Sequence, residues 1–318
     1  PLFKYPSYEL SLTSKVLEVI EYEALDIIHG HYAIPHAVTG YLAKQVALKN
    51  GRKIAVVTTL HGTDITLVGL DPSFLPLVKF SIEESDGVTA VSKFLSQKTL
   101  SNYNIDKEIE TIYNFVDTAR FKPFDCEKYR KCFARECEKV LMHTSNFRGV
   151  KRVQDTIRIL ERVKKELPVK LVLIGDGPER SDCERLTREL GLQKDVSFLG
   201  KQDGLPDLLN TANLFLMPSQ SESFGLAALE AMSCGIPIIS SSVGGLPELN
   251  VHNQTGYIAE FGDVDQMAKY TLELLTNEKK YTAFSKNCRE RAVTHFDISL
   301  IIPQYVAYYE KVLTQTRG

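Results

Sequence analysis

The sequence predicts an α/β protein with two domains, each built on a doubly wound parallel sheet, and a ligand cleft where the domains face each other. The length of 318 residues suffices for about two domains with separate cores. Short apolar segments alternate with segments of helical spacing, as in parallel strands covered by helices on both faces. The alternation pauses at Phe121–Pro123, the predicted linker. Such sheets bind ligands beyond the carboxyl ends of their strands.

The first predicted domain covers residues 1–118 and contains helices over 12–25 and 73–84, where apolar residues recur at helical spacing. Ser92 has the position of an N-cap for a further helix. The strands are expected at 26–29, 53–59, 87–91 and 109–113. Four strands are few for a doubly wound sheet, and no Gly-rich phosphate loop precedes any of them. We therefore expect a first domain that is shorter than a complete doubly wound domain.

The second predicted domain covers residues 119–298 and repeats the alternation of strand and helix. Its strands are expected at 139–144, 170–174, 196–199, 214–217, 236–240 and 256–259. A C-terminal helix over 299–318 carries Tyr305, Tyr308 and Tyr309. This helix could pack on its own domain or cross back to the first one.

The composition excludes several classes of function. Lys and Arg number 38 against 40 Asp and Glu, and no stripe of basic and aromatic residues indicates a nucleic-acid partner. No apolar run reaches membrane-spanning length and no signal peptide opens the chain, so a cytoplasmic location is expected. Six cysteines in a chain of this length do not form a disulfide scaffold. A homo-oligomer is compatible with the sequence.

The segment Pro218–Met232 carries the strongest functional signal, because it runs from an apolar strand into an Ala/Leu-rich helix. Glu222 and Glu230 lie eight residues apart across that junction, about 12 Å if the segment is helical. This spacing suits opposite ends of an extended ligand. Between them, the N–H groups of 224–227 belong to a helix start, which attracts anions. The pattern indicates a diphosphate flanked by two hydroxylated rings, as in a nucleotide-sugar, although Glu222 on a solvated loop is the simpler alternative.

Further polar residues follow other predicted strands. Arg148 and Lys151 could together neutralise a leaving diphosphate, or form a solvated basic loop. Gly175–Pro178 is a weaker signal, since it could let the backbone approach a nucleotide at Gly177 or only form a tight turn. His61, also just beyond a strand, is about equally a catalytic or a structural histidine.

Other chemistries lack their sequence patterns. His29, His31 and His36 do not have zinc-site spacing, so no metal is expected. The cysteines form no Cys-x-x-Cys pair in the polar stretch around Cys132, and we interpret them as free thiols. Neither the Gly-x-Ser-x-Gly elbow of hydrolases nor the P-loop of ATPases is present.

With Glu222-x7-Glu230, Ser145–Arg152 and Gly175–Pro178 in place, the second domain resembles the retaining glycosyltransferases of family four. The resemblance spans nearly the whole chain and implies the GT-B fold, in which two Rossmann-like domains face a cleft. Because members of the family begin with a strand and a Gly-rich loop, it also implies a truncated first domain that lacks this N-terminal strand and loop. His31–Ala37, Thr58–Thr66 and Tyr113–Asp117 are similar to members that transfer N-acetylglucosamine from UDP-GlcNAc to the hydroxyl of L-malate, the first step of bacillithiol biosynthesis. UDP-GlcNAc is then a co-substrate, and no cofactor is implied.

The resemblance also implies roles for individual residues. It implies a donor site made of Arg148, Lys151, Gly177, Glu222, Phe224, Gly225, Leu226 and Glu230. It implies catalytic roles for His61, Arg148, Lys151 and Glu222. It implies an acceptor site with Tyr32, Thr59 and Asn114. Malate is a dianion and should meet a cation on the first domain, for which Lys79 and Lys93 are candidates, although a solvated lysine is the simpler interpretation of each. Glu230 would bind the uridine ribose and His61 would lie near the reacting face of the sugar.

Several hypotheses remain open at this stage. The expected mechanism retains the anomeric configuration by attack on the face that UDP leaves, whereas a rival mechanism makes Glu222 a covalent nucleophile. A family-four enzyme with another acceptor would keep every donor motif. A UDP-sugar epimerase would need no acceptor, and a non-catalytic UDP-sugar-binding protein would show no turnover.

Overall fold

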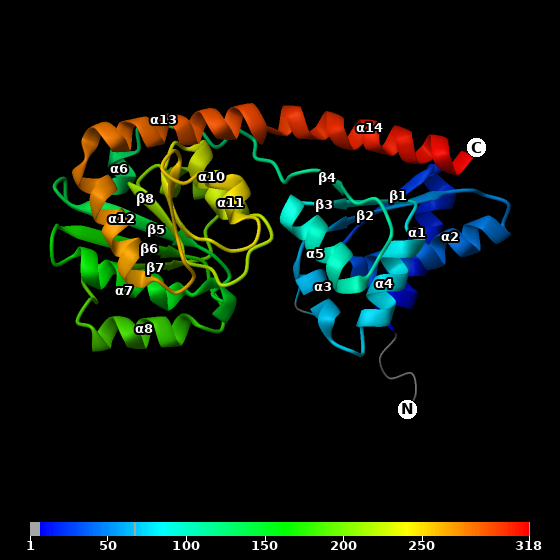
Figure 1. Cartoon of the computed structure of the whole chain (residues 1–318), viewed down its shortest axis with the longest axis horizontal. Helices are drawn as coiled ribbons and strands as arrows, with labels where there is room; N and C mark the ends of the chain where they lie inside the picture. The colour runs from blue at the N-terminus through cyan, green and yellow to red at the C-terminus, as the bar shows by residue number, and fades with distance from the viewer. Residues whose placement is uncertain (1–6, 67, 318) are drawn as a thin grey trace. The chain divides into compact units, whose positions relative to one another are not determined.

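The computed structural model describes residues 7–66 and 68–317. Internal contacts divide the chain into two compact units, shown in Figure 1. Unit 1 runs to Asn114 and includes the chain from Ile301 onwards, while unit 2 is Phe115–Leu300. Each unit contains one sheet, and every strand pair in both sheets is parallel. The predicted α/β class with two parallel sheets is confirmed.

The sheet of unit 1 has the strand order β1-β2-β3-β4. Its strands are β1 (Ile27–His31), β2 (Ala55–Leu60), β3 (Gly87–Ala90) and β4 (Glu110–Thr111). All six residues of β2 are buried. His31 pairs with Thr59 in register, so β1 and β2 end at the same edge of the sheet. The β1 strand continues two residues beyond the predicted segment, which brings His31 to this edge.

Seven helical segments of unit 1 surround this sheet among the described residues. They are α1 (Tyr8–Glu23), η1 (Ala33–Ala37), α2 (Val38–Lys49), α3 (Thr63–Thr66), η2 (Val68–Leu70), α4 (Leu75–Glu84) and α5 (Lys93–Tyr103). The predicted N-cap is confirmed, because the Ser92 hydroxyl accepts a hydrogen bond from the Leu95 N–H at 3.1 Å. No helix in the described residues combines the length and apolar character needed to cross a bilayer.

The last helix, α14 (Ile298–Arg317), contacts β3 although it follows unit 2 in the chain. The Tyr308 hydroxyl donates to the Val88 carbonyl at 3.0 Å. A Cβ on Gly87 would lie 2.7 Å from a Val312 methyl carbon, so glycine is needed for this close approach. The helix is therefore an integral part of unit 1 from Ile301 onwards.

The sheet of unit 2 has the strand order β10-β9-β8-β5-β6-β7. Its strands are β5 (Lys139–Thr144), β6 (Val169–Ile174), β7 (Val196–Gly200), β8 (Leu214–Met217), β9 (Ile238–Ser241) and β10 (Gly256–Ala259). All six predicted strands are present. The β9 strand starts two residues later than predicted, because the Ile236 N–H bonds to the Ala231 carbonyl and Pro237 has no N–H for the ladder.

The helices of unit 2 lie on both faces of the sheet (Figure 1). They are α6 (Glu127–Arg130), η3 (Gly149–Lys151), α7 (Val153–Val163), α8 (Arg180–Glu189), α9 (Leu205–Leu209), α10 (Leu226–Ser233), α11 (Leu246–Leu249), α12 (Val264–Thr276) and α13 (Glu278–His295). Figure 1 shows α7 and α8 on one face and α10 and α11 on the other. In the polar stretch around Cys132, only the short α6 is helical.

The strand order locates the functional edge of unit 2. From β5 the chain proceeds through β6 and β7 in one direction, and from β8 it proceeds through β9 and β10 in the other. The β5 and β8 strands are neighbours, with Leu141 opposite Leu214. The connections that follow β5 and β8 therefore lead to helices on opposite faces of the sheet, and the switch point between them is where doubly wound sheets bind their ligands.

Candidate functional site

The two loops at the switch point carry opposite charges that meet. Lys151, in the loop after β5, contacts Glu222, in the loop after β8, with its Nζ 2.6 Å from Oε2. The side chains are 21% and 11% exposed, so this ion pair is largely removed from solvent. The Gln220 N–H donates to the Val150 carbonyl at 2.8 Å and joins the same two loops through their backbones. The structure thus brings together two residues that the sequence predicted for the donor site.

Arg148 lies three residues before Lys151 and differs from it in two respects. Its side chain is exposed, and it makes no hydrogen bond or ion pair within the part of the chain that the structure describes. An arginine without a carboxylate partner keeps its full charge and all five donors for an anion. Arg148 is therefore the cation of this loop that is free to bind a ligand.

The position of the helix start corrects one expectation. The α10 helix begins at Leu226, so Glu222 lies before it and the helical estimate of about 12 Å to Glu230 does not apply. Gly225 is the N-cap, with φ at +101°, and a Cβ there would lie 2.7 Å from a Leu246 methyl carbon. Phe224 is buried and its ring packs on Phe296 at 5.5 Å. The opening-turn amides therefore start at Leu226, two residues later than predicted.

Glu230 is a partly buried carboxylate on α10. Burial raises the pKa of Glu230 to about 7, and the nearby positive charge of Arg120 opposes this shift. No described residue donates a hydrogen bond to its carboxylate. A buried carboxyl group of this kind can accept hydrogen bonds from the hydroxyl groups of a ligand. The ribose-binding role of Glu230 stays a prediction.

Gly175 and Gly177 support the basic loop by close packing. A Cβ on Gly175 would lie 1.8 Å from the Ser145 carbonyl oxygen, and one on Gly177 would lie 1.9 Å from that of Asn146. The space beside Gly177 is thus occupied by the basic loop. The two glycines let the turn after β6 hold the loop that carries Arg148.

His143 is a buried residue of the site that the sequence analysis did not identify. Its Nδ1 lies 2.8 Å from the Leu216 carbonyl oxygen, and its Nε2 lies 2.8 Å from the Ser145 hydroxyl. That hydroxyl accepts from the Phe147 N–H at 3.2 Å. Burial lowers the pKa of His143 to about 4, so the ring is neutral at pH 7 and connects β8 to the basic loop. A lone histidine in an apolar strand was the available signal.

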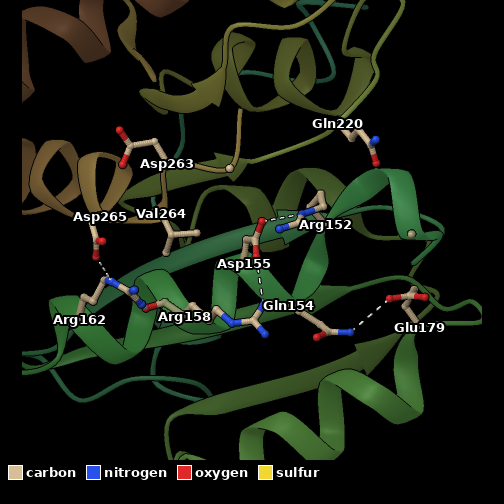
Figure 2. A pocket seen from close by; sticks show the side chains of 12 residues that line it. Arg152, Gln154, Asp155, Arg158, Arg162, Glu179, Gln220, Asp263, Val264 and Asp265 are labelled. Atoms are coloured by element: carbon tan, nitrogen blue, oxygen red, sulfur yellow. Dashed lines mark hydrogen bonds and ion pairs between the residues drawn. The ribbon is translucent and has the colours of Figure 1, made fainter. Parts of the chain in front are cut away.

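A pocket of about 640 Å³ lies beside the same loop (Figure 2). Arg152 and Arg158 both donate to Asp155, at 2.7 and 3.1 Å, and Arg162 pairs with Asp265. Each of these three arginines is paired with a carboxylate, so none of them is free to bind an anion in the way that Arg148 is. Its Arg152–Asp155 ion pair instead anchors the residue that follows Lys151 at the start of α7.

The carboxyl ends of β1 and β2 in unit 1 carry a cluster of aromatic and histidine side chains. His61 Nε2 lies 2.8 Å from His31 Nδ1, and the Tyr32 ring is 5.0 Å from the His61 ring between centroids. Burial and the neighbouring His31 lower the pKa of His61 to about 4. His61 and Tyr32, predicted as catalytic and acceptor residues, are thus adjacent.

Asp64 supports this cluster and was not identified from the sequence. Its buried carboxylate accepts from the Ala33 N–H at 2.7 Å and the Gly62 N–H at 2.9 Å. Burial raises the pKa of Asp64 despite these bonds. Asp64 joins the segments that follow Tyr32 and His61, so it positions both.

The other predicted acceptor residues, Thr59, Asn114 and Lys79, have no described contact with the His61 ring. The Thr59 hydroxyl is fully buried and bonds to Thr89 Oγ1 at 2.7 Å. Asn114 is half-buried at the end of unit 1. Lys79 donates to the Asn104 carbonyl at 3.1 Å and pairs with Glu83 at 3.7 Å. No described contact joins Lys79 to the His61 cluster, so the structure does not bring this predicted cation together with it.

The three histidines considered for a metal are engaged otherwise. His29 bonds to Tyr309 and Thr59, His31 to His61, and the His36 Nδ1 donates to the His31 carbonyl at 2.5 Å. Within residues 7–66 and 68–317, no three His, Cys, Asp or Glu side chains are arranged to hold a metal ion.

Comparison with known families agrees with this geometry. Residues 127–291 match the model of glycosyl transferases group 1, and residues 1–120 match that of glycosyltransferase family 4. The chain belongs to glycosyltransferase family 4. The first of these matches covers the switch-point loops and α10 of unit 2, and the second covers the histidine cluster of unit 1.

Relatives with assigned activities are similar over most of the chain. N-acetyl-alpha-D-glucosaminyl L-malate synthase of Bacillus anthracis is 45% identical over 318 residues, which is all of this chain and 83% of that protein. D-inositol 3-phosphate glycosyltransferase of Mycolicibacterium smegmatis is 28% identical and covers 92% of this chain and 69% of its own length. The names of these two relatives give different acceptors.

Solved structures share the fold. HepE from Anabaena, in complex with UDP and glucose, superposes with a TM-score of 0.84 at 24% identity, over 94% of this chain and 81% of that one. Sucrose-phosphate synthase from Thermosynechococcus elongatus has a TM-score of 0.81 at 22% identity, over 98% and 81% of the two chains. These neighbours confirm the predicted GT-B fold.

Proposed function

We propose that this glycosyltransferase moves N-acetylglucosamine from UDP-GlcNAc to the hydroxyl of L-malate, with retention of the anomeric configuration. The observation that carries the proposal is the switch-point site of unit 2. There Arg148, which has no partner in the described chain, and the Lys151–Glu222 ion pair lie in the loops that precede α7 and α10. The named activity of the Bacillus anthracis relative supports the choice of sugar and acceptor.

In the proposed mechanism, Arg148, Lys151 and the opening turn of α10 stabilise the departing diphosphate. The acceptor attacks the face that UDP leaves, and a β-phosphate oxygen takes the malate proton. Catalysis is then mainly positioning and charge stabilisation. Two cations supply the positive charge, so the proposal requires no metal. Glu230 would bind the uridine ribose through its hydroxyls, and Gly177 would act through the basic loop.

We propose that His61, Tyr32 and Asn114 of unit 1 act on the acceptor. Thr59 would act indirectly, since its hydroxyl is already bonded within the sheet. Lys79 is not included, because its ammonium group is held by Asn104 and Glu83. We also propose a cytoplasmic location, which agrees with six free cysteines.

The test measures UDP release from UDP-GlcNAc with a panel of hydroxy acids, and product masses by mass spectrometry. We expect release with L-malate, and a loss of about 10²–10³ in kcat for Arg148→Ala, comparable with removal of one oxyanion donor. Arg188→Ala, an exposed arginine on the last turn of α8, is the matched control and should keep full activity.

The outcomes separate the alternatives. Release with another acceptor only would replace malate and keep the donor site. Conversion of UDP-GlcNAc without any acceptor would indicate an epimerase, and UDP binding without turnover would indicate a binding protein. A trapped glycosyl-Glu222 adduct would favour the covalent mechanism.

A further inference from the structure

The C-terminal helix is connected to the His61 cluster by hydrogen bonds and ring contacts inside unit 1. The Tyr309 hydroxyl, on α14, lies 2.7 Å from His29 Nδ1. His29 Nε2 lies 2.7 Å from the Thr59 hydroxyl, so both ring nitrogens of His29 are engaged. The His29 ring packs on the His31 ring with centroids 4.5 Å apart. Tyr309 therefore holds a ring that in turn supports His31.

His31 makes the only hydrogen bond of the His61 ring among the described residues. It joins His31 Nδ1 to His61 Nε2 at 2.8 Å. Burial, as the main cause, lowers the pKa of all three histidines, to about 4 for His29 and His61, so the rings are neutral near pH 7. A neutral imidazole has one donor and one acceptor nitrogen. In such a pair, one nitrogen carries the proton and the other accepts the hydrogen bond.

The pair has a direct consequence for the nitrogen of His61 that remains available. If His31 Nδ1 carries the proton, His61 Nε2 accepts the hydrogen bond and His61 Nδ1 must be a donor. If His31 Nδ1 carries no proton, His61 Nε2 donates the hydrogen bond and His61 Nδ1 is an acceptor. The position of one proton thus decides which hydrogen bond His61 can offer to a substrate.

We propose that His31, and Tyr309 acting through His29, are positioning residues that hold His61 in one tautomer and one orientation. The proposal rests on the role of His61 in the proposed transfer reaction. It assigns a function to the last helix of the chain, whose Tyr309 lies 248 positions after His61 in the sequence.

The activity experiment compares four variants of the full chain, each with a single substitution. Tyr309→Phe removes the hydroxyl but keeps the ring, and we expect kcat to fall about tenfold while the KM for UDP-GlcNAc is unchanged. Tyr308→Phe is the matched control on the same helix: it loses a bond to the Val88 carbonyl and touches no histidine of the cluster, so activity should be unchanged. His31→Gln should lose activity, whereas His31→Asn, which places an amide near the Nδ1 position, should restore most of it.

The second measurement does not depend on activity. Nitrogen-15 NMR of the imidazoles should show one tautomer for His61 in the unmodified chain and in Tyr308→Phe, and a mixture in Tyr309→Phe and His31→Gln. One unchanged tautomer in all variants would overturn the proposal, even if malate is the acceptor. If the chain does not glycosylate malate but the tautomer mixture appears, the positioning role stands and the proposed function fails.

Discussion

Glu230 shows how burial of a single carboxylate lowers the stability of a folded protein. Burial raises its pKa to about 7, whereas an unfolded chain leaves a glutamate near 4.5. The folded state therefore favours the protonated form. As pH rises above 4.5 the unfolded state ionises more readily, so this residue lowers the free energy of unfolding progressively up to about pH 7.

We predict that Glu230→Gln stabilises the empty protein at pH 8 by on the order of 1–3 kcal/mol, with a smaller gain at pH 5. The same substitution should weaken UDP binding, because an amide replaces the carboxylate that is proposed to accept hydrogen bonds from the ribose hydroxyl groups. Urea unfolding at both pH values and calorimetric UDP titration measure the two effects. Glu166→Gln, at an exposed position, is the control. Equal stabilisation at pH 5 and pH 8 would contradict the pKa argument.

The two cations of the basic loop differ in their partners. Lys151 is held by Glu222, so a diphosphate that binds Lys151 must compete with a carboxylate 2.6 Å away. Arg148 has no such competitor in the described chain. This difference explains why Arg148, rather than Lys151, is the cleaner test of the donor site: its exposed side chain can be removed without leaving an unpaired buried charge.

At the scale of elements, the start of α10 depends on one glycine. Gly225 combines a φ of +101° with a position where a Cβ would lie 2.7 Å from Leu246. Gly191, at φ +68°, offers the comparison, because a Cβ added there would meet no atom within 4 Å. A substitution at Gly191 therefore isolates the cost of the backbone conformation.

We predict that Gly191→Ala costs about 1–2 kcal/mol, from the left-handed conformation alone. Gly225→Ala should cost about 1–3 kcal/mol more, because the methyl group also overpacks the core against Leu246. Gly225→Ala should in addition weaken UDP binding, since it displaces the opening turn. Denaturant unfolding of both variants gives the comparison, and equal costs would show that the contact with Leu246 relaxes freely.

The turn after β6 packs closely against the loop that carries Arg148. The turn after β6 was interpreted from its Gly-Asp-Gly-Pro sequence as an approach to nucleotide or a tight turn. In the structure the segment forms the turn between β6 and α8, its glycines lie against the carbonyls of Ser145 and Asn146, and the approach to a nucleotide stays a prediction. A glycine pattern reports that some backbone comes close, but only the fold determines which backbone it is.

At the scale of the molecule, the chain ends by returning to the unit in which it began. The Tyr308 and Tyr309 hydroxyls bond to Val88 and His29, and Arg317 pairs with Asp26 at 2.9 Å. A segment that follows unit 2 in sequence thus contributes buried contacts to unit 1.

We predict that removal of residues 301–318 destabilises unit 1 selectively. Amides of β1, β2 and β3 should lose protection from hydrogen exchange, because Tyr308 and Val312 no longer cover β3, while the six-stranded sheet of unit 2 should keep its protection. Exchange measured by mass spectrometry on both units tests this. Removal of residues 316–318 alone is the control. Equal loss of protection in the two sheets would contradict a local role for the helix.

The sequence by itself determined the α/β class, ten parallel strands and the loops at which polar residues gather. Buried parallel strands are continuous apolar runs, and their spacing is visible without neighbours in space. The motif around Glu222 and the loop of Arg148 and Lys151 also indicated the family, because their chemistry is local.

Only the tertiary structure decided which side chains meet. It paired Lys151 with Glu222, joined His31 to His61, directed Lys79 to Asn104 and brought Tyr309 to His29. The reason is physical: residues far apart in sequence come together through strand order and helix packing, and no local pattern of apolar and polar residues encodes such contacts. Hydrogen bonding and charge at the candidate site therefore follow from the fold.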